Sequence, residues 1–280
     1  MPPVRIRIDL AYDGTDFHGW ADQPGLRTVQ GVLEAALATA LRRPQLRVTC
    51  AGRTDTGVHA RGQVVHADVD ADAFAASSGR PDTPPGEALR RRLNGILPAD
   101  VRVHRVAESP AGFDARFSAL WREYVYRIAD RPATQDPLLR GHVLSWGREL
   151  DEQAMHRAAQ RLVGEHDFAS FCRRREGATT IRTLLGYDWT RRADGLLEAT
   201  VRADAFCHSM VRALVGCLVA VGEGRRDDAW VQQVLTDARR NPAVTVIHAH
   251  GLTLERVCYP PDAELASRAE TARSVRRLDR

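Results

Sequence analysis

The segment AGRTDTGVHA, residues 51–60, has the residue types and spacing best suited to chemistry. Gly52 and Gly57 bracket Asp55 and allow the backbone to turn sharply on both sides of it. Arg53 lies two residues before the aspartate, and a nearby guanidinium keeps a carboxyl group ionised at neutral pH. Such a carboxylate can act as a nucleophile or a general base. The same spacing also fits a turn aspartate that only accepts hydrogen bonds from backbone amides, so both interpretations stay open.

A second segment combines aromatic and arginine side chains. It begins with FDARFSA at residues 113–119 and continues to Arg122, Tyr124 and Tyr126, which share one face of a predicted strand. Such a face can stack unpaired RNA bases. A half-buried amphipathic strand shows the same alternation, so the pattern by itself supports both interpretations.

A third segment, AFCHSMVRALVG at residues 205–216, places Arg212 on an otherwise apolar predicted helix. A buried arginine without a carboxylate partner costs several kcal/mol, and Asp55 is a candidate partner. Alternatively, the arginine extends its apolar stem along the helix and reaches solvent.

The composition excludes several kinds of chemistry. All 40 basic residues are arginine against 36 acidic residues, which gives a net charge of +4. Without lysine, a Schiff-base enzyme and a Walker A phosphate loop are excluded. The five cysteines have no C-x-x-C spacing and no histidine at zinc-finger spacing, so we expect neither a disulfide framework nor a metal site. Clusters at 90–92 and 173–175 are either nucleic-acid contacts or solvated faces.

No targeting or membrane segment is evident. The first residues contain no apolar run of signal-peptide length. The longest apolar stretch, residues 213–222, is half of the ~20 residues that a membrane span needs. We therefore expect a soluble cytoplasmic protein that makes no membrane contact.

The order of predicted elements indicates an α+β fold. In the first part, Thr28 is a plausible N-cap and Asn94 is followed by Gly95 at a helix end. The order β-α-β-β-α-β is the ferredoxin-like plan. The strands are expected at 4–12, 46–50, 63–69 and 101–106, and the helices at 28–42 and 87–94.

The second part repeats a similar order, with a two-residue hairpin turn expected at Asp194-Gly195. The predicted domains are an α/β half at 1–110 that carries the Asp55 loop, an α/β half at 111–260 and a charged tail at 261–280. The two ferredoxin-like halves would form an extended, mostly antiparallel sheet with helices packed on it and a central groove between them. Residues 75–86 are expected to be a loop, and the tail is either frayed or a short surface helix. The strands are expected at 121–128, 184–190, 196–202 and 252–257, and the helices at 151–163, 210–221 and 230–238.

The sequence is similar to two known families to very different extents. Asp13-Gly14-Thr15 after a strand is similar to the phosphatase motif D-x-D-G-T, but the first aspartate of that motif is missing and the element order gives no parallel sheet. Five separated blocks resemble the tRNA pseudouridine synthase A family instead, from about Val4 to Tyr259. They are AYDGTDFHGW, AGRTDTGVHARGQVVH, FDARFSALWREYVYRI, GEHDFASF and ADAFCHSMVRALVG.

This resemblance implies a reaction and a set of site residues. The enzymes of that family isomerise uridine to pseudouridine at positions 38 to 40 of the tRNA anticodon stem-loop. By resemblance, Asp55 is the nucleophile that acts on a flipped-out uridine, and Arg212 is the basic residue that pairs with it. Tyr124 stacks on the uracil and assists proton removal. The resemblance leaves open whether Asp55 attacks C1′ or promotes a glycal intermediate.

The resemblance also implies that the central groove is an RNA-binding cleft, and it implies how the substrate is bound there. Arg53 matches the arginine that helps admit or hold the flipped nucleotide, and we place Arg116 and His59 of the matched blocks among the substrate-binding residues with Tyr124. The family is a homodimer that needs no metal and no organic cofactor. The alternative is a non-catalytic RNA-binding module of the same fold, which would have no need of a carboxylate facing phosphates.

Overall fold

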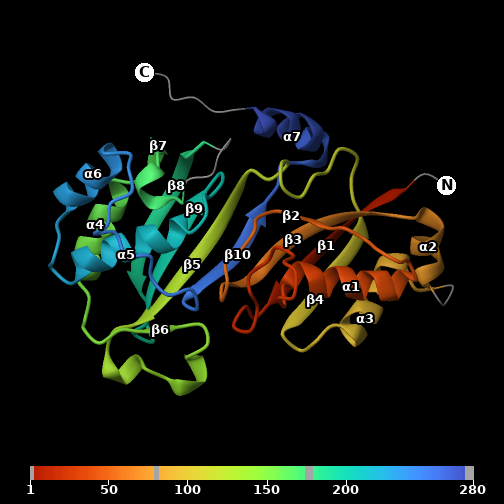
Figure 1. Ribbon diagram of the computed structural model, residues 1–280, viewed down its shortest axis with the longest axis horizontal. Coiled ribbons are helices and arrows are strands. Elements are labelled where there is room, and N and C mark those ends of the chain that lie inside the picture. Colours follow the sequence, from red (N-terminus) through yellow and green to blue (C-terminus); the bar gives the residue numbers. More distant parts are fainter. Residues whose placement is uncertain (1–2, 79–81, 174–178, 275–280) are drawn as a thin grey trace. The chain divides into compact units, whose positions relative to one another are not determined.

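The structure is a computed structural model that describes residues 3–78, 82–173 and 179–274 (Figure 1). It divides into two compact units. The first unit comprises Met1–Leu120 together with Leu254–Ser274, and the second comprises Trp121–Thr253. The division therefore follows Leu120 rather than residue 110, and the chain returns to the first unit near its C-terminus.

The first unit has the ferredoxin-like plan that the sequence predicts. Its strands are ordered β4-β1-β3, and β2 pairs with β3. Val65 of β3 is opposite Ile8 of β1 on one side and Cys50 of β2 on the other, so β3 lies between the two strands that α1 connects. All three pairings are antiparallel. The elements are β1 (Val4–Tyr12), α1 (Val29–Leu41), β2 (Thr49–Cys50), β3 (His59–Val69), α2 (Ala71–Ala75), α3 (Pro85–Ile96), β4 (Val101–Glu108) and α7 (Leu265–Arg273).

Local sequence explains most of these elements. In β1, Ile6, Ile8 and Leu10 alternate with polar residues and are fully buried, as expected for a strand with one apolar face. Thr28 caps α1 as predicted, because its hydroxyl accepts a hydrogen bond from the Gly31 N–H at 3.3 Å.

Other boundaries in the first unit differ from the prediction. The strand expected at 46–50 is reduced to Thr49–Cys50, and β3 begins at His59 rather than residue 63. Gly95 lies inside α3 and does not end it, because the helix continues to Ile96. The helix begins at Pro85, a residue that suits the first position of a helix. The predicted loop at 75–86 contains a 3-10 turn and the start of α3, and residues 79–81 lie outside the described residues.

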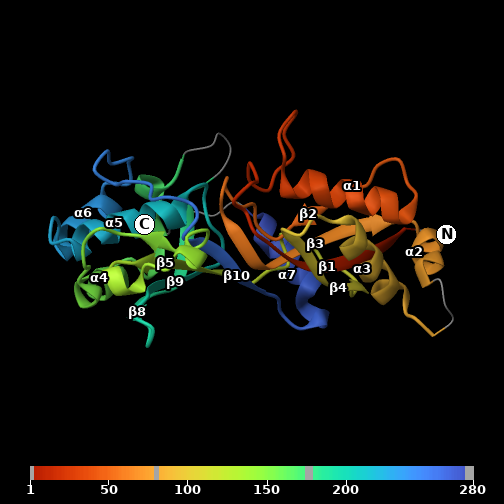
Figure 2. The ribbon, with the colours of Figure 1, turned by 90° about the horizontal axis from the view of Figure 1, so that it is seen from below.

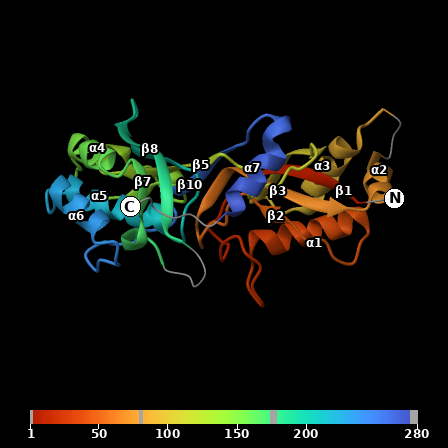
Figure 3. The same ribbon diagram turned by 90° about the horizontal axis from the view of Figure 1, so that it is seen from above.

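The second unit contains an antiparallel sheet in the order β5-β9-β8-β7, with the short β6 parallel to β5. Figures 2 and 3 show α4, α5 and α6 together in this unit. The α+β class and the mostly antiparallel pairing predicted from the sequence are confirmed. The elements are β5 (Trp121–Ala129), β6 (Leu144–Ser145), α4 (Glu152–Gln160), β7 (Gly164–Asp167), β8 (Ile181–Arg191), β9 (Leu197–Ala203), α5 (Met210–Gly222) and α6 (Asp228–Thr236), and β10 (Leu252–Cys258) leads back to the first unit.

The second unit also departs from the prediction in several places. β8 begins at Ile181 rather than residue 184, and α6 spans Asp228–Thr236 rather than 230–238. The helix expected to reach residue 163 ends at Gln160, and the unpredicted β7 follows it. The β8–β9 connection spans 192–196 rather than two residues, and the Arg192 N–H donates to the Leu196 carbonyl at 2.9 Å. Gly195 has a φ of +85° in this loop, where a side chain would be strained. Short 3-10 turns at Ala76–Ser78, Pro132–Thr134, Pro137–Leu139, Ala169–Phe171 and Asp262–Glu264 complete the described elements.

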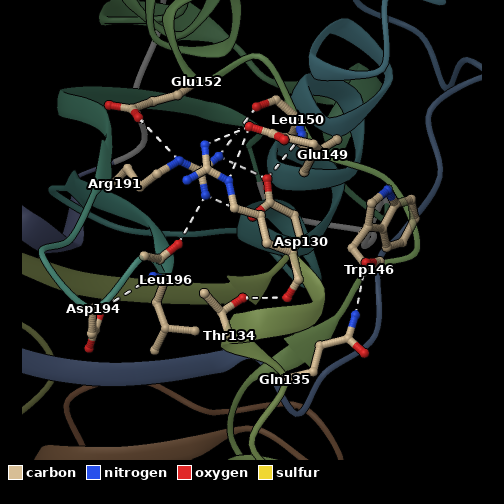
Figure 4. Close-up of polar contacts among 12 residues, drawn as sticks. Asp130, Thr134, Gln135, Trp146, Glu149, Leu150, Glu152, Arg191, Asp194 and Leu196 are labelled. Atoms are coloured by element: carbon tan, nitrogen blue, oxygen red, sulfur yellow. Dashed lines mark hydrogen bonds and ion pairs between the residues drawn. The ribbon is translucent and has the colours of Figure 1, made fainter.

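A buried ion pair lies where β5 ends (Figure 4). Asp130 is 2% exposed, and its carboxylate accepts two hydrogen bonds from the Arg191 guanidinium, at 2.7 and 2.8 Å. The Leu150 N–H donates to the same carboxylate at 2.9 Å. Burial acts to raise the pKa of Asp130, but the hydrogen bonds and charge of Arg191 outweigh it and hold that pKa below its ordinary value.

The helix α7 is an integral part of the first unit. Leu265 and Ala269, which lie one turn apart, are both buried. Figures 2 and 3 show α7 on the side of the first unit's strands away from α1. Of the two interpretations of the tail, the structure therefore supports a helix over Leu265–Arg273. Residues 275–280 lie outside the described residues.

The structure describes all of the arginine cluster at 90–92 but only part of the cluster at 173–175. Arg90 donates two hydrogen bonds to the Glu87 carboxylate, both at 2.8 Å, and Arg91 donates one at 2.9 Å, which favours a solvated helix face over a nucleic-acid contact. In the cluster at 173–175, Arg174 and Arg175 lie outside the described residues. Over the described part of the chain, no helix is long and apolar enough to cross a membrane.

Candidate active site

Asp55 lies in the loop that joins β2 to β3, where it is half-buried and Arg53 is exposed. The Val58 N–H donates to the Asp55 carbonyl at 3.1 Å, which closes a four-residue turn. Gly57 is the third residue of this turn and has a φ of +76°. Because that position of a turn favours glycine when φ is positive, the sharp turn predicted beside Asp55 is confirmed at Gly57.

The segment DGTDFHGW, residues 13–20, packs its backbone against this loop. The Trp20 N–H donates to the Thr54 carbonyl at 3.0 Å, and the Gly57 N–H donates to the Phe17 carbonyl at 3.3 Å. Asp55 is therefore flanked on both sides by backbone groups that are hydrogen-bonded to one neighbouring segment.

Two glycines allow this close approach. A Cβ atom on Gly14 would lie 2.1 Å from the Val58 carbonyl oxygen. On Gly19, whose φ is +88°, it would lie 2.9 Å from the Thr54 carbonyl oxygen. Neither position accepts a side chain unless the backbone that carries Asp55 shifts.

A buried hydrogen-bond network lies beneath the loop. The hydroxyl groups of Tyr12 and Thr54 are 2.8 Å apart. The Gln63 amide donates to the Tyr12 hydroxyl at 3.3 Å and to the Gly52 carbonyl at 2.8 Å. Burial raises the pKa of Tyr12, so its hydroxyl stays protonated at neutral pH. The network thus holds the loop at both Gly52 and Thr54, next to Asp55.

His59 supports the same region from the other side. It is buried, and its Nδ1 accepts a hydrogen bond from the Gly14 N–H at 3.0 Å and lies 3.1 Å from Asp13 Oδ1. Burial acts to raise the pKa of Asp13, but hydrogen bonds from Thr15 and the proximity of His59 lower it overall. The role of His59 as a substrate contact stays a prediction, while the described contacts are to the 13–15 turn.

Tyr124 lies on β5 in the second unit, opposite Val201 of β9. It is 6% exposed and makes an edge-to-face contact with Phe206 at a centroid distance of 5.1 Å. Its strand neighbours on the same face are buried: the Tyr126 hydroxyl donates to the His248 carbonyl at 2.7 Å, and Arg122 Nη1 donates to the Asp204 carbonyl at 2.6 Å. Tyr126 is therefore a core residue rather than part of a base-stacking face.

Arg212 lies in the first turn of α5, whose other residues are all buried. Its Nε donates to the Ile247 carbonyl at 2.8 Å, and the Ile247 N–H donates back to the Arg212 carbonyl at 3.3 Å. Gly216 permits this packing, because a Cβ there would lie 1.9 Å from the Thr245 carbonyl oxygen. The side chain of Arg212 is thus directed by the segment at 245–247.

The structure therefore places the predicted residues in two groups. Asp55, Arg53, His59 and Arg116 belong to the first unit, and Tyr124 and Arg212 belong to the second. The pairing of Arg212 with Asp55 stays a prediction. Among the described residues, no group of three or more His, Cys, Asp or Glu side chains could hold a metal ion.

Sequence reasoning missed the residues that support the loop. Tyr12 is 42 positions from Thr54 and 51 from Gln63, and each of the three is an ordinary polar residue of a strand or loop. The available signal was the pair of glycines at 14 and 19 in a short segment after a strand, because glycines there allow a close backbone approach.

Comparison with known proteins identifies the family. A family model described as tRNA pseudouridine synthase matches residues 10–118 and 158–260, which include Asp55 and Arg212 but not Tyr124. The chain is 60% identical over 273 residues to tRNA pseudouridine synthase A of Frankia casuarinae, covering 98% of this chain and 96% of the relative. The identity is 57% to that of Streptomyces griseus (98% and 95% covered) and 51% to that of Mycobacterium leprae (98% and 96%).

These matches define the class of protein as an RNA-modifying isomerase. The chain belongs to the tRNA pseudouridine synthase family.

Proposed function

We propose that this protein converts uridine to pseudouridine at positions 38, 39 or 40 of the tRNA anticodon stem-loop, with Asp55 as the nucleophile. Family membership supports isomerisation of tRNA uridines. The observation that supports the assignment of Asp55 is how firmly its loop is held. On either side of Asp55, the Thr54 carbonyl accepts a hydrogen bond from Trp20 and the Gly57 N–H donates one to Phe17, and the Thr54 hydroxyl contacts Tyr12. A rigid loop that presents a carboxylate suits positioned chemistry.

The proposed reaction is balanced without water or a redox partner. The N1–C1′ bond breaks, the uracil rotates, and a C5–C1′ bond forms. C5 loses a proton and N1 gains one. The carboxylate of Asp55 acts at the sugar and is regenerated at the end. Glycosidases usually employ two carboxylates because one must activate water or protonate a leaving group that departs. Here the leaving base is also the incoming base, so a single carboxylate suffices.

The other site residues have supporting roles in this proposal. The target uridine must leave its stem-loop, which costs a few kcal/mol. Stacking of the uracil on Tyr124 offsets part of that cost, and Tyr124 assists removal of the C5 proton. Arg212 pairs with the Asp55 carboxylate, while Arg53 and Arg116, both exposed, contact the RNA.

The test is tritium release from tRNA transcribed with uridine labelled at C5. The wild type is expected to release tritium, and Asp55→Ala is expected to release none while it binds tRNA with an affinity within about threefold of the wild type. Release by Asp55→Ala would overturn the assignment of the nucleophile. A wild type that binds tRNA tightly but releases no tritium would support the non-catalytic RNA-binding module instead.

The modified positions and the assembly are tested separately. The product of a transcript with uridine at 38, 39 and 40 is mapped first, and each position found modified is then replaced singly by cytidine. Each replacement should remove only the modification at that position, and modification outside positions 38 to 40 would contradict the proposal. We also infer a homodimer that acts in the cytoplasm. Light scattering should then report twice the chain mass of 31.0 kDa, and cell fractionation should recover the protein with the cytosol.

A further inference from the structure

Two guanidinium groups lie over one aromatic ring at the surface of the first unit. The guanidinium carbons of Arg116 and Arg273 are each 4.9 Å from the centre of the Phe117 ring. Arg116 is exposed, and the side chain of Arg273 is 54% exposed. A guanidinium stacked on a ring uses its flat face for that contact, so the N–H donors at its edge can bind a phosphate.

From this arrangement we propose that α7 and the segment at 113–119 form a binding surface for the sugar–phosphate backbone of tRNA. This surface, the α7 surface, consists of Arg116, Phe117, Arg268 and Arg273. The inference rests on the proposed function for the identity of its RNA, and it gives α7, which lies beyond the residues matched by the family model, a role in substrate binding.

Charge on the α7 surface favours an anionic partner. Asp114 Oδ1 accepts hydrogen bonds from the backbone N–H groups of Arg116 and Phe117, at 2.8 and 2.9 Å. Its other oxygen accepts a hydrogen bond from Arg273 Nη2 at 3.4 Å, which is long for a hydrogen bond. The α7 surface contains the guanidinium groups of Arg116, Arg268 and Arg273. The carboxylates near it are those of Asp114 and Glu270, so positive charges outnumber negative ones by three to two.

The helix is held in position on the segment that carries Arg116. The Ser118 hydroxyl donates to the Leu265 carbonyl at 3.0 Å, and Arg268 Nη2 donates to the Ala119 carbonyl at 3.3 Å. The two segments are so close at Gly112 that a Cβ there would lie 2.6 Å from the Ala266 Cβ. The arginines of the α7 surface are therefore set by packing rather than by a loose tail.

The α7 surface shares its packing with the start of the Asp55 loop. Leu265 of α7 packs in one apolar cluster with Ala51, Val64, Phe113 and Ala115. Ala51 directly follows β2 and begins the loop. Asp55 and the α7 surface belong to the same unit, so an RNA whose uridine reaches Asp55 has its neighbouring phosphates close to this unit. The negative charge of those phosphates complements the positive charge of the α7 surface. These features favour RNA over an acidic peptide.

The experiment measures tRNA affinity at several salt concentrations between 50 and 300 mM. Each lost phosphate contact should lower the slope of log Kd against log salt by about 0.7 to 0.9. Arg273→Ala and Arg116→Ala are each expected to show that change. Phe117→Leu keeps both charges, so it should weaken binding about two- to threefold with an unchanged slope. Arg157→Ala, an exposed arginine on α4, controls for the loss of one positive charge.

The same preparations are assayed for pseudouridine formation. Rates are measured over a range of tRNA concentrations. Arg273→Ala is expected to reach the wild-type kcat at saturating tRNA but to have a higher KM for tRNA than the wild type. Slopes for both arginine variants equal to those of the wild type and Arg157→Ala would overturn the inference, and with it the RNA contact assigned to Arg116, but would leave the proposed reaction at Asp55 intact. Lowered slopes in a protein whose wild type forms no pseudouridine would support the α7 surface and refute the proposed reaction.

Discussion

Asp130 in the second unit and the loop around Asp55 in the first are held by hydrogen bonds to different groups. For Asp130, the hydrogen bonds reach the carboxylate itself, from Arg191 and from the Leu150 N–H. Around Asp55, the described bonds reach the neighbouring backbone and the Thr54 hydroxyl. Hydrogen bonds to a buried carboxylate offset the free-energy cost of removing its charge from water, so they stabilise the fold. Bonds to the flanking backbone fix the direction in which the side chain leaves the chain, which is what a reacting group requires.

The largest expected effect is on the rate at Asp55. Asp55→Asn should lower pseudouridine formation by about 10⁴-fold or more, because the group that reacts with the sugar is lost. Its free energy of unfolding should stay within about 1 kcal/mol of the wild type, because the bonds that hold the loop remain. Tritium release and urea unfolding measure the two quantities. A large loss of stability would place Asp55 in the same class as Asp130 and break the comparison.

The reverse pattern is expected at Asp130. Asp130→Ala leaves Arg191 without its buried partner, so the free energy of unfolding should fall by about 3 to 5 kcal/mol. The kcat of the folded enzyme should remain within about threefold of the wild type, because the pair supports the end of β5 and carries no reacting group. Replacing both partners, as Asp130→Leu with Arg191→Met, should recover much of the stability. Failure of the double variant to recover would mean that packing, not the unpaired charge, causes the loss.

A smaller effect sharpens the comparison at the loop. Thr54→Val removes the hydroxyl that contacts Tyr12 and should lower the free energy of unfolding by about 1 to 3 kcal/mol. It should also lower kcat by about 10- to 100-fold at unchanged KM, since a small displacement of Asp55 misaligns it. Thr54→Ser keeps the hydroxyl and should retain most activity. Equal kcat values for the two variants would show that this hydrogen bond does not position the loop.

The smallest effect is the pH dependence of the Asp130 pair. Because the pKa of Asp130 is lowered on folding, its contribution is complete above the unfolded value of about 4 and is lost as pH falls through the folded value. The stability difference between the wild type and Asp130→Asn should therefore be constant from pH 5 to 8 and narrow below about pH 4. Urea unfolding across this range measures it. If the stability difference between the wild type and Asp130→Asn changed between pH 5 and 8, the pKa of Asp130 in the folded protein would not be lowered as stated.

The elements that sequence predicted well are those with strong local signals. β1 is bounded as expected because its apolar residues alternate, and α1 because a capping threonine precedes its apolar face. β7, whose sequence is GEHD, has no apolar pattern and exists only because it pairs with β8. The helix α7 has few apolar residues, and its two buried positions become apparent only when the rest of the first unit is present.

The candidate site follows the same division. The glycines and the arginine around Asp55 are adjacent in the chain, so the amino-acid sequence alone singles out the loop. The groups that hold it, Tyr12 and Gln63, are separated by 51 positions and meet only through the pairing of β1 with β3. Likewise, nothing in the local sequence of Arg273 indicates that it stacks on Phe117.

The discontinuity of the first unit has a consequence for how the protein is made. Residues up to Leu120 supply the Asp55 loop, but Leu265, which completes the apolar cluster beneath it, is translated after the whole second unit. During synthesis the second unit can fold as soon as it leaves the ribosome, whereas the first must wait for α7. The nascent chain thus exposes the unfilled cluster until translation has passed α7, and an engineered circular permutant that begins near Leu254 would remove this delay.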